Sequence, residues 1–275
     1  MKTLYVTDLD GTLLNTKDRV SEYSIRTINR LMEKGMLFTY ATARSLVSAS
    51  VVTQGLSIDM PVIVYNGCLV IQPRTGKVLS SIQFTRKERE KAIEIIKSNQ
   101  ISPLVYSYIG GKECVSWNPD KENEGVQRYL SLRKGDKRLR PVEDNQLYDG
   151  ESFYYTCIGE KEKLLPIYEA LCLDNRYRCT LAQELYREEY WCEIMPSAAT
   201  KANAIKQVKE LFYCGRVVAF GDAVNDMNMF SIADECYAVE NAVSELKEVA
   251  TGIIACNDAD GVARWLEEKV SKEFG

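Results

Sequence analysis

The sequence contains no histidine among its 275 residues. Without an imidazole, one chain cannot assemble Ser-His-Asp or Cys-His catalysis. Acid–base chemistry near neutral pH must then fall to carboxylates, lysines, tyrosines or a metal-bound water. A zinc site of the Cys/His type is equally disfavoured, because none of the nine cysteines belongs to a CxxC pair.

Long apolar runs and an excess of basic charge are also missing. No apolar run approaches the ~18–20 residues that span a bilayer, and Asp8 and Asp10 interrupt the N-terminal apolar stretch. We therefore expect neither membrane association nor a signal peptide. With 35 basic and 39 acidic residues, we expect no binding to nucleic acid. The scattered cysteines are typical of a reducing compartment and predict a cytoplasmic protein.

The N-terminal segment carries two closely spaced acids. Asp8 and Asp10 follow the apolar run Leu4–Val6 and precede Gly11 and Thr12. We expect a buried strand over residues 3–7, with both carboxylates on the same face at its end. Two neighbouring carboxylates repel each other unless a cation or a proton relieves them. The arrangement therefore predicts a reaction centre.

Apolar strands alternate with helices over the first 80 residues. We expect strands over 3–7, 36–41 and 62–65, with a helix over 21–34 between the first two. Strands that are apolar throughout and alternate with helices indicate a parallel sheet covered on both faces. The same rhythm returns after about residue 200.

The rhythm changes in the middle of the chain. A capping box at Thr85 and Glu88 opens a helix, and Gly110-Gly111 separates two strand-like segments as in a hairpin. The segment predicts an α+β unit with an antiparallel sheet. We therefore expect a discontinuous α/β core, residues 1–82 and 191–275, with a second domain inserted at 83–190.

Polar residues follow the predicted strands of the core. In an open parallel sheet, sites form at the carboxyl ends of the strands, so these residues are expected to converge. They are Asp8 and Asp10 after the first strand, Thr42 after the second, Asp222, Asn225 and Asp226 after a later one, and Lys201 at a helix start.

Together these motifs resemble the haloacid dehalogenase superfamily, and most closely its Cof-type phosphatases. The matching segments are DLDGTLL at 8–14, ATAR at 41–44, Asn66-Gly67, EIMP at 193–196, Lys201, GDAVND at 221–226 and DGVA at 260–263. The resemblance implies a Rossmann-like parallel-sheet core with an inserted α+β cap domain that selects the substrate.

The resemblance also implies roles for these residues. Asp8 would be the nucleophile that forms an aspartyl phosphate, and Asp10 the general acid and then base. Mg²⁺ would be bound by the Asp8 and Asp222 carboxylates and the Asp10 backbone carbonyl, with Asp226 supporting the metal from nearby. The implied phosphate-binding residues are Leu9, Thr42, Ala43, Lys201 and Asn225. Taken alone, Asp226 is equally well explained as a helix cap.

Some positions depart from the family pattern or allow a structural explanation. Ala43 stands where the family usually has glycine, and a left-handed backbone there would cost ~1 kcal/mol or more. Asn66-Gly67 is equally consistent with a simple turn, and Arg44 is better explained as a surface or helix-start residue. The aromatic residues of the middle segment are expected in the core of the cap or its hinge: Trp117, Tyr186, Tyr190 and Trp191.

These observations predict an Mg²⁺-dependent phosphatase acting on a small phosphorylated metabolite such as a sugar phosphate. A phosphomutase would use the same nucleophile and acid and stays open. A dehalogenase would need neither Asp10 nor Asp222. A non-catalytic metabolite-binding protein is the alternative from another class, although Asp8, Asp10 and Lys201 are all present. The natural substrate and the oligomeric state are left open.

Overall fold

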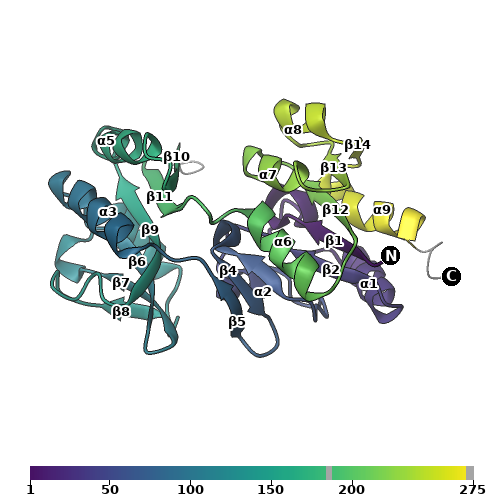
Figure 1. Ribbon diagram of the computed structural model, residues 1–275, viewed down its shortest axis with the longest axis horizontal. Helices are drawn as coiled ribbons and strands as arrows, with labels where there is room; N and C mark the ends of the chain where they lie inside the picture. The colour runs from purple at the N-terminus through teal and green to yellow at the C-terminus, as the bar shows by residue number, and fades with distance from the viewer. Residues whose placement is uncertain (184–187, 271–275) are drawn as a thin grey trace. The chain divides into compact units, whose positions relative to one another are not determined.

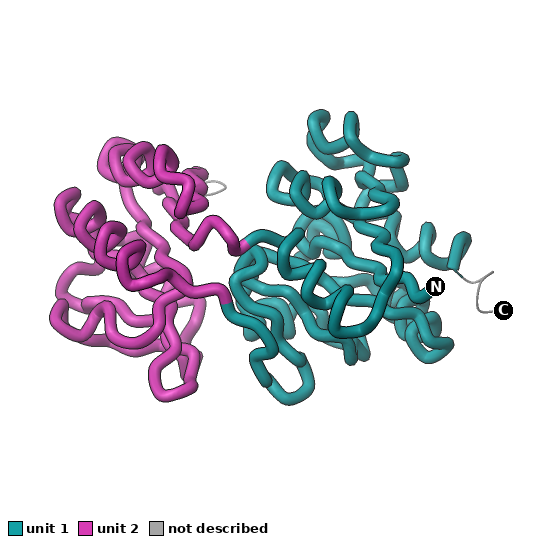
Figure 2. The backbone as a smooth tube through the Cα atoms, viewed as in Figure 1, with its two compact units in different colours: residues 1–81, 200–275 teal, residues 82–199 magenta. Residues whose placement is uncertain are grey.

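The structure is a computed structural model that describes residues 1–183 and 188–270. The chain forms two compact units, which Figure 2 colours separately. Unit 1 combines residues 1–81 with residues 200–275, and unit 2 is residues 82–199. Within the described residues, no helix combines the length and apolar character needed to cross a membrane.

A parallel five-stranded sheet forms the centre of unit 1 (Figure 1), with the strand order β14-β13-β12-β1-β2. The strands are β1 (Thr3–Thr7), β2 (Leu37–Tyr40), β12 (Arg216–Gly221), β13 (Glu235–Val239) and β14 (Gly252–Ile254). β1 pairs in parallel with β12 on one side and β2 on the other. Its apolar side chains are buried, which confirms the predicted parallel-sheet core.

Several helices of unit 1 begin at a residue whose side chain caps them. The helices of this unit are α1 (Glu22–Glu33), α2 (Leu46–Val52), α6 (Lys201–Leu211), α7 (Met227–Phe230), α8 (Ser244–Val249) and α9 (Gly261–Val270). The Ser21 hydroxyl accepts a hydrogen bond from the backbone N–H of Ser24, three residues into α1. Thr200 caps α6 in the same way. Both caps satisfy donors that a helix start leaves unpaired.

A smaller antiparallel sheet follows the first part of unit 1. It consists of β3 (Val62–Val64), β4 (Leu69–Gln72) and β5 (Lys77–Ser81). Ala41, directly after β2, forms a parallel bridge with Ile63 of β3. The strand expected over 62–65 therefore runs parallel to β2, while its other neighbour is antiparallel.

Unit 2 contains a six-stranded sheet in the order β10-β11-β9-β6-β7-β8, antiparallel except between β7 and β8. Its strands are β6 (Leu104–Ile109), β7 (Lys112–Trp117), β8 (Leu139–Pro141), β9 (Glu151–Gly159), β10 (Tyr177–Gln183) and β11 (Tyr190–Pro196). Its helices are α3 (Arg86–Ser98), α4 (Glu124–Ser131) and α5 (Lys161–Cys172). The predicted capping box is present at Thr85, and Gly110-Gly111 joins β6 to β7 with positive φ at both glycines.

The core of unit 2 lies between its sheet and the helices α3 and α5. Residues of these helices pack against alternate residues of the central strands, among them Ala92, Ile96, Leu164, Ile167, Leu171, Val105, Tyr155, Cys157, Cys192 and Ile194. Trp191 points to the other face, where its ring lies 5.8 Å from that of Tyr129. Tyr186 lies outside the described residues.

The boundary between the units differs from the expected one. β11 pairs with β10 on one side and with β9 on the other, so it belongs to the sheet of unit 2. The second crossing lies between Ala199 and Thr200, and not at residue 191. An apolar strand shows in its sequence that it is buried, but not which strands it pairs with. The expected boundary therefore cut through a strand.

Candidate active site

Asp8 is the first residue after β1 and lies among buried groups. The residue is only 4% exposed, and its backbone N–H donates to the carbonyl of Phe220 in β12 over 2.9 Å. One carboxylate oxygen, Oδ1, accepts a hydrogen bond from Lys201 Nζ at 2.5 Å. The other oxygen stays outside this ion pair.

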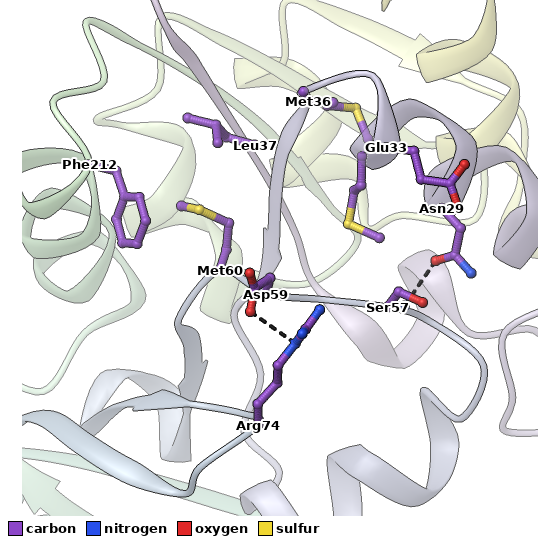
Figure 3. A pocket seen from close by; sticks show the side chains of 11 residues that line it. Asn29, Glu33, Met36, Leu37, Ser57, Asp59, Met60, Arg74 and Phe212 are labelled. Atoms are coloured by element: carbon purple, nitrogen blue, oxygen red, sulfur yellow. Dashed lines mark hydrogen bonds and ion pairs between the residues drawn. The ribbon is translucent and has the colours of Figure 1, made fainter.

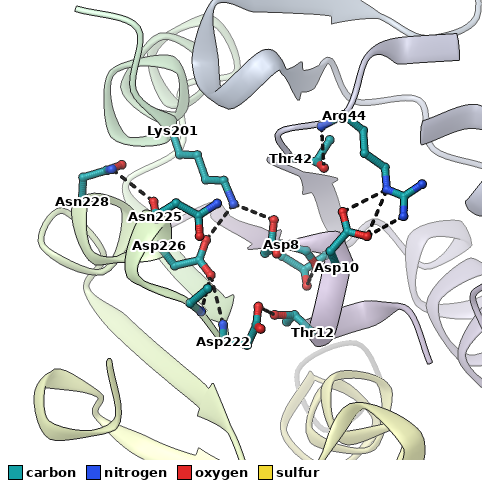
Figure 4. Close-up of polar contacts among 12 residues, drawn as sticks. Asp8, Asp10, Thr12, Thr42, Arg44, Lys201, Asp222, Asn225, Asp226 and Asn228 are labelled. Atoms are coloured by element: carbon teal, nitrogen blue, oxygen red, sulfur yellow. Dashed lines mark hydrogen bonds and ion pairs between the residues drawn. The ribbon is translucent and has the colours of Figure 1, made fainter. Parts of the chain in front are cut away.

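Lys201 occupies the first position of α6 and is completely buried. Its ammonium contacts Asp8 on one side and Asp226 Oδ1, at 2.7 Å, on the other (Figure 4). An ammonium carries three donors. Two are used by these carboxylates, which leaves one for a further anionic group.

Asp226 uses both carboxylate oxygens within the protein. Oδ1 binds Lys201, and Oδ2 accepts the backbone N–H groups of Asp222 and Ala223 at 3.0 and 3.1 Å. The side chain thus fixes both the lysine and the turn after β12. It has less capacity for a metal than a carboxylate with a free oxygen.

Asp222 follows β12 and faces the turn after β1. Its Oδ1 accepts a hydrogen bond from the hydroxyl of Thr12 at 2.9 Å. A Cβ added to Gly11, which has φ +74°, would overlap the Asp222 carboxylate. Only glycine lets the backbone at position 11 pass this close to the acid. In the N-terminal motif, Gly11 therefore makes room for the Asp222 carboxylate and Thr12 binds it.

The site concentrates negative charge. One carboxylate oxygen from each of Asp8, Asp222 and Asp226 lies within 4.8 Å of the other two, next to the positive charge of Lys201. Burial, reinforced by Asp226 and Asp222, holds the pKa of Asp8 well above its ordinary value despite the opposing effect of Lys201. Burial raises the pKa of Asp222 to about 6. The two carboxylates raise the pKa of Lys201 and outweigh the effect of its burial.

This donor set suits a small hard cation. Mg²⁺ prefers oxygen ligands and takes one or two carboxylates from a protein. Lys201 occupies Oδ1 of Asp8 and Thr12 occupies Oδ1 of Asp222, which leaves the second oxygen of each for a cation. Both oxygens of Asp226 already accept hydrogen bonds within the protein. A divalent cation held by Asp8 and Asp222 would offset the burial and the repulsion among the acids that raise the pKa values of both. The residues present therefore fit the expected ion.

Asp10 does not share the environment of Asp8, contrary to the expectation of one strand face. β1 ends at Thr7, and the chain then winds through the turn η1 (Leu9–Leu13), so the alternation of a strand no longer applies. The Asp8 carboxylate points toward Lys201, and that of Asp10 points toward Arg44 (Figure 4). The Asp10 side chain is 50% exposed.

Thr42 lies in the loop after β2 and is buried. Its hydroxyl oxygen accepts the backbone N–H of Arg44 at 3.1 Å, which leaves the hydroxyl hydrogen available as a donor. Ala43 is exposed and does not adopt a positive φ. The strain of a left-handed backbone is therefore absent at Ala43, and the residue has an ordinary backbone conformation.

The turn η2 (Tyr65–Gly67) connects this loop with α6. The N–H of Asn66 donates to the Thr42 carbonyl at 2.9 Å. A Cβ added to Gly67 would overlap the carbonyl of Thr200, the residue before Lys201. Asn66-Gly67 is thus a turn, as the structural explanation expected, and it packs against the helix start that carries the lysine.

Leu9 and Asn225 differ from the other expected phosphate-binding residues. The Leu9 side chain is fully buried, so only its backbone can face a ligand. Asn225 lies in η4 (Val224–Asp226), and its carbonyl accepts a hydrogen bond from Asn228 Nδ2 at 3.1 Å. For Asn225, a side-chain contact with phosphate or Lys201 stays a prediction.

Sequence reasoning missed the supporting role of Asn228. Its Oδ1 accepts the backbone N–H of Ala202 at 3.1 Å, while its amide reaches Asn225. Asn228 thereby ties the start of α6 to the turn after β12. Its position two residues after Asp226 is the only sequence signal, and it is a weak one.

A pocket elsewhere in unit 1 lacks this chemistry. The pocket, of about 410 Å³, lies where β2 begins, at the opposite end from Thr42 (Figure 3). Methionines 32, 36 and 60 and Phe212 supply its apolar surface. Its charged residues are Glu33 and the exposed ion pair of Asp59 with Arg74. It contains none of the acids grouped around Lys201.

Comparison with known proteins matches nearly the whole chain to one family. The family model of the haloacid dehalogenase-like hydrolases matches residues 5–266. The crystal structure of TM0651 from Thermotoga maritima is similar, with a TM-score of 0.79 and 27% identity, covering 98% of this chain and 97% of that one.

Two curated relatives from Bacillus subtilis align over nearly their full length. Both are named 5-amino-6-(5-phospho-D-ribitylamino)uracil phosphatase. YwtE is 27% identical and the alignment covers 97% of this chain and 98% of that protein. YitU is 26% identical, with 98% and 97% covered. The chain belongs to the haloacid dehalogenase-like hydrolases, as its Cof-type motifs predict, and is an enzyme of that family.

Proposed function

We propose that this protein is an Mg²⁺-dependent phosphatase that hydrolyses a small phosphorylated metabolite. The observation that carries the proposal is the buried ion pair of Lys201 with Asp8, close to the second acid Asp222. The cluster combines a nucleophilic carboxylate, the ammonium of Lys201 and an acidic site for a metal ion. Phosphoryl transfer requires these three features.

In the first step, the Asp8 carboxylate attacks phosphorus while the bond from phosphorus to the leaving oxygen breaks. An aspartyl phosphate forms on Asp8, and the Asp10 carboxyl gives its proton to the leaving oxygen. Lys201 holds Asp8 Oδ1, which orients the carboxylate, and offers its third proton to the phosphoryl group.

In the second step, water attacks the same phosphorus and the bond to Asp8 breaks. The Asp10 carboxylate takes a proton from this water, which restores the starting state and releases inorganic phosphate. The Thr42 hydroxyl and the N–H groups of Leu9 and Ala43 act as donors to the phosphoryl oxygens. When bound by Asp8, Asp222 and the Asp10 carbonyl, Mg²⁺ would supply positive charge that lowers the repulsion between anions.

The relatives support a phosphorylated small molecule as the substrate and suggest which compounds to test. 5-Amino-6-(5-phospho-D-ribitylamino)uracil is a candidate because the names of two relatives contain it. Sugar phosphates, pyridoxal phosphate and flavin mononucleotide belong in the same test.

We propose that unit 2 acts as a substrate-selecting cap. The absence of a CxxC pair and the nine free thiols support a cytoplasmic location.

A phosphate-release screen over such a panel, with Mg²⁺, tests the proposal. We expect release from at least one metabolite and from 4-nitrophenyl phosphate, loss of activity with EDTA, and no turnover by Asp8→Asn. Activity in EDTA would contradict the metal assignment, and wild-type activity of Asp8→Asn would contradict the nucleophile. Formation of an isomeric phosphate in place of free phosphate would identify a phosphomutase.

A further inference from the structure

Arg44 holds the carboxylate of Asp10 with two of its nitrogens. Nε lies 2.9 Å from Oδ2 and 3.1 Å from Oδ1, and Nη2 lies 2.5 Å from Oδ1 (Figure 4). A guanidinium that contacts both oxygens fixes the plane and direction of a carboxylate, unlike a point charge. Since Asp10 is half exposed, this fork is the main restraint on its side chain that the structure describes.

The backbone of Arg44 belongs to the loop that carries Thr42. Its N–H donates to the Thr42 hydroxyl at 3.1 Å, and its carbonyl accepts the N–H of Tyr65 at 3.0 Å. The next residue, Ser45, caps α2. The guanidinium therefore extends from a backbone that is anchored on both sides.

A second acid binds the guanidinium through the nitrogen that also contacts Asp10 Oδ1. Asp18 accepts a hydrogen bond from Arg44 Nη2. Asp18 itself lies in a tight turn, with φ +57° and its N–H bonded to the Asn15 carbonyl at 2.9 Å. The Arg44 side chain, only 21% exposed, is thus fixed between two carboxylates and cannot swing freely.

We propose that Arg44 is a positioning residue for proton transfer by Asp10. By fixing the direction of the Asp10 carboxyl relative to the loop of Thr42, it sets how well the proton reaches the leaving oxygen. This inference rests on the proposed function, because the acid–base role of Asp10 belongs to that proposal. It replaces the expectation that Arg44 is only a surface or helix-start residue.

Two esters with different leaving groups separate positioning from general damage. Phenyl phosphate releases an oxygen that needs a proton, whereas 2,4-dinitrophenyl phosphate releases a stable anion. We expect Arg44→Gln to lower kcat/KM for phenyl phosphate about 100-fold, the scale of a general acid. For the dinitrophenyl ester, the loss in kcat/KM should stay within about threefold. On phenyl phosphate, the kcat/KM of Arg44→Lys should lie between those of wild type and Arg44→Gln, because a point charge restores part of the contact.

A double variant tests whether the effect runs through Asp10. In an Asp10→Asn background, Arg44→Gln should add less than about threefold on phenyl phosphate, since the proton it positions is gone. Arg74→Gln, which removes the exposed pair with Asp59 in the same unit, serves as the control and should leave both esters unchanged. Thermal melting of each variant reports whether it is folded.

Equal losses on both esters in a folded Arg44→Gln, or a full additional loss in the double variant, would overturn the assignment. The proposed function would still stand if the wild type hydrolyses both esters and Asp8→Asn neither. A wild-type enzyme that hydrolyses neither ester would remove the proposed function and this assignment together.

Discussion

Lys201 balances the charge of the site at the scale of a single residue. It is fully buried between two carboxylates, and its ammonium compensates their negative charge. Removing one member of a buried ion pair leaves the other charges uncompensated, which costs more than an exposed pair ever contributes.

Lys201→Met should therefore reduce both activity and stability. We expect kcat/KM to fall by at least about 1,000-fold and the free energy of unfolding to fall by about 3 kcal/mol at neutral pH without metal. Urea unfolding and 4-nitrophenyl phosphate assays measure the two effects. Lys206→Met, an exposed lysine of the same helix, should change stability by less than about 0.5 kcal/mol. Equal effects of the two substitutions would contradict the charge balance.

The raised pKa of Asp222 determines how the stability of the metal-free protein should depend on pH. Its pKa is about 6 in the folded state and has an ordinary value of 3.8. As pH rises from about 4, the unfolded chain loses this proton before the folded one does, so ionisation of Asp222 destabilises the fold. This loss of folding stability is complete once the pH exceeds the pKa of Asp222 in the folded state.

Asp222→Asn removes this titration while keeping an oxygen for Thr12. In EDTA, the variant should equal wild type near pH 3 and become more stable by on the order of 2 kcal/mol above pH 7. Urea unfolding at a series of pH values tests this. Added Mg²⁺ should stabilise the wild type and leave the variant unchanged. A difference that is constant with pH would contradict the raised pKa.

At the scale of elements, the sequence predicted the parallel sheet of unit 1 and the helices α1 and α6 because these elements carry local signals. The strand expected over 3–7 is β1, the helix expected over 21–34 is α1, and the helix start expected at Lys201 is that of α6. The convergence of Asp8, Lys201 and Asp222 followed from the rule that sites form at the carboxyl ends of parallel strands.

The contacts of Asp10 and Arg44 could not be predicted in this way. They depend on side-chain directions in two loops, where the alternation of a strand no longer holds. The bond between Asn228 and Ala202 was hidden for the same reason, since it joins two elements through one amide. Patterns predict elements, and contacts between loops require coordinates.

The turn η2 provides a test of how elements position the lysine. Gly67→Ala introduces a Cβ against the Thr200 carbonyl at φ +98°, so the start of α6 must move. We expect a loss of about 2 kcal/mol in stability and at least a tenfold loss in kcat, because Lys201 moves with the helix. Thermal melting and steady-state kinetics measure both.

Gly76→Ala is the matched control for this substitution. Gly76 also has a positive φ, +70°, but among the described residues no heavy atom beyond its chain neighbours lies within 4 Å of an added Cβ. It should cost only about 1 kcal/mol and leave kcat unchanged. If both variants keep full activity, the contact between η2 and α6 does not position Lys201.

At the scale of the molecule, unit 2 has its own sheet and its own apolar core. A segment with a complete core is expected to fold alone. We predict that the fragment 82–199 folds, with cooperative unfolding by circular dichroism. The fragment 82–190 should not, because it lacks all of β11 except Tyr190, and β11 lies between β9 and β10. Equal behaviour of the two fragments would contradict the boundary at Ala199.

The central claim is that Asp8 carries the phosphoryl group during turnover. The most direct measurement is rapid acid quench during hydrolysis of 4-nitrophenyl phosphate with Mg²⁺, followed by mass spectrometry of the tryptic peptide 3–17, which contains Asp8 and Asp10. We predict one phosphoryl group on Asp8, present during turnover and absent after the substrate is consumed. An unmodified peptide throughout turnover, or a phosphoryl group on another residue, would contradict the account.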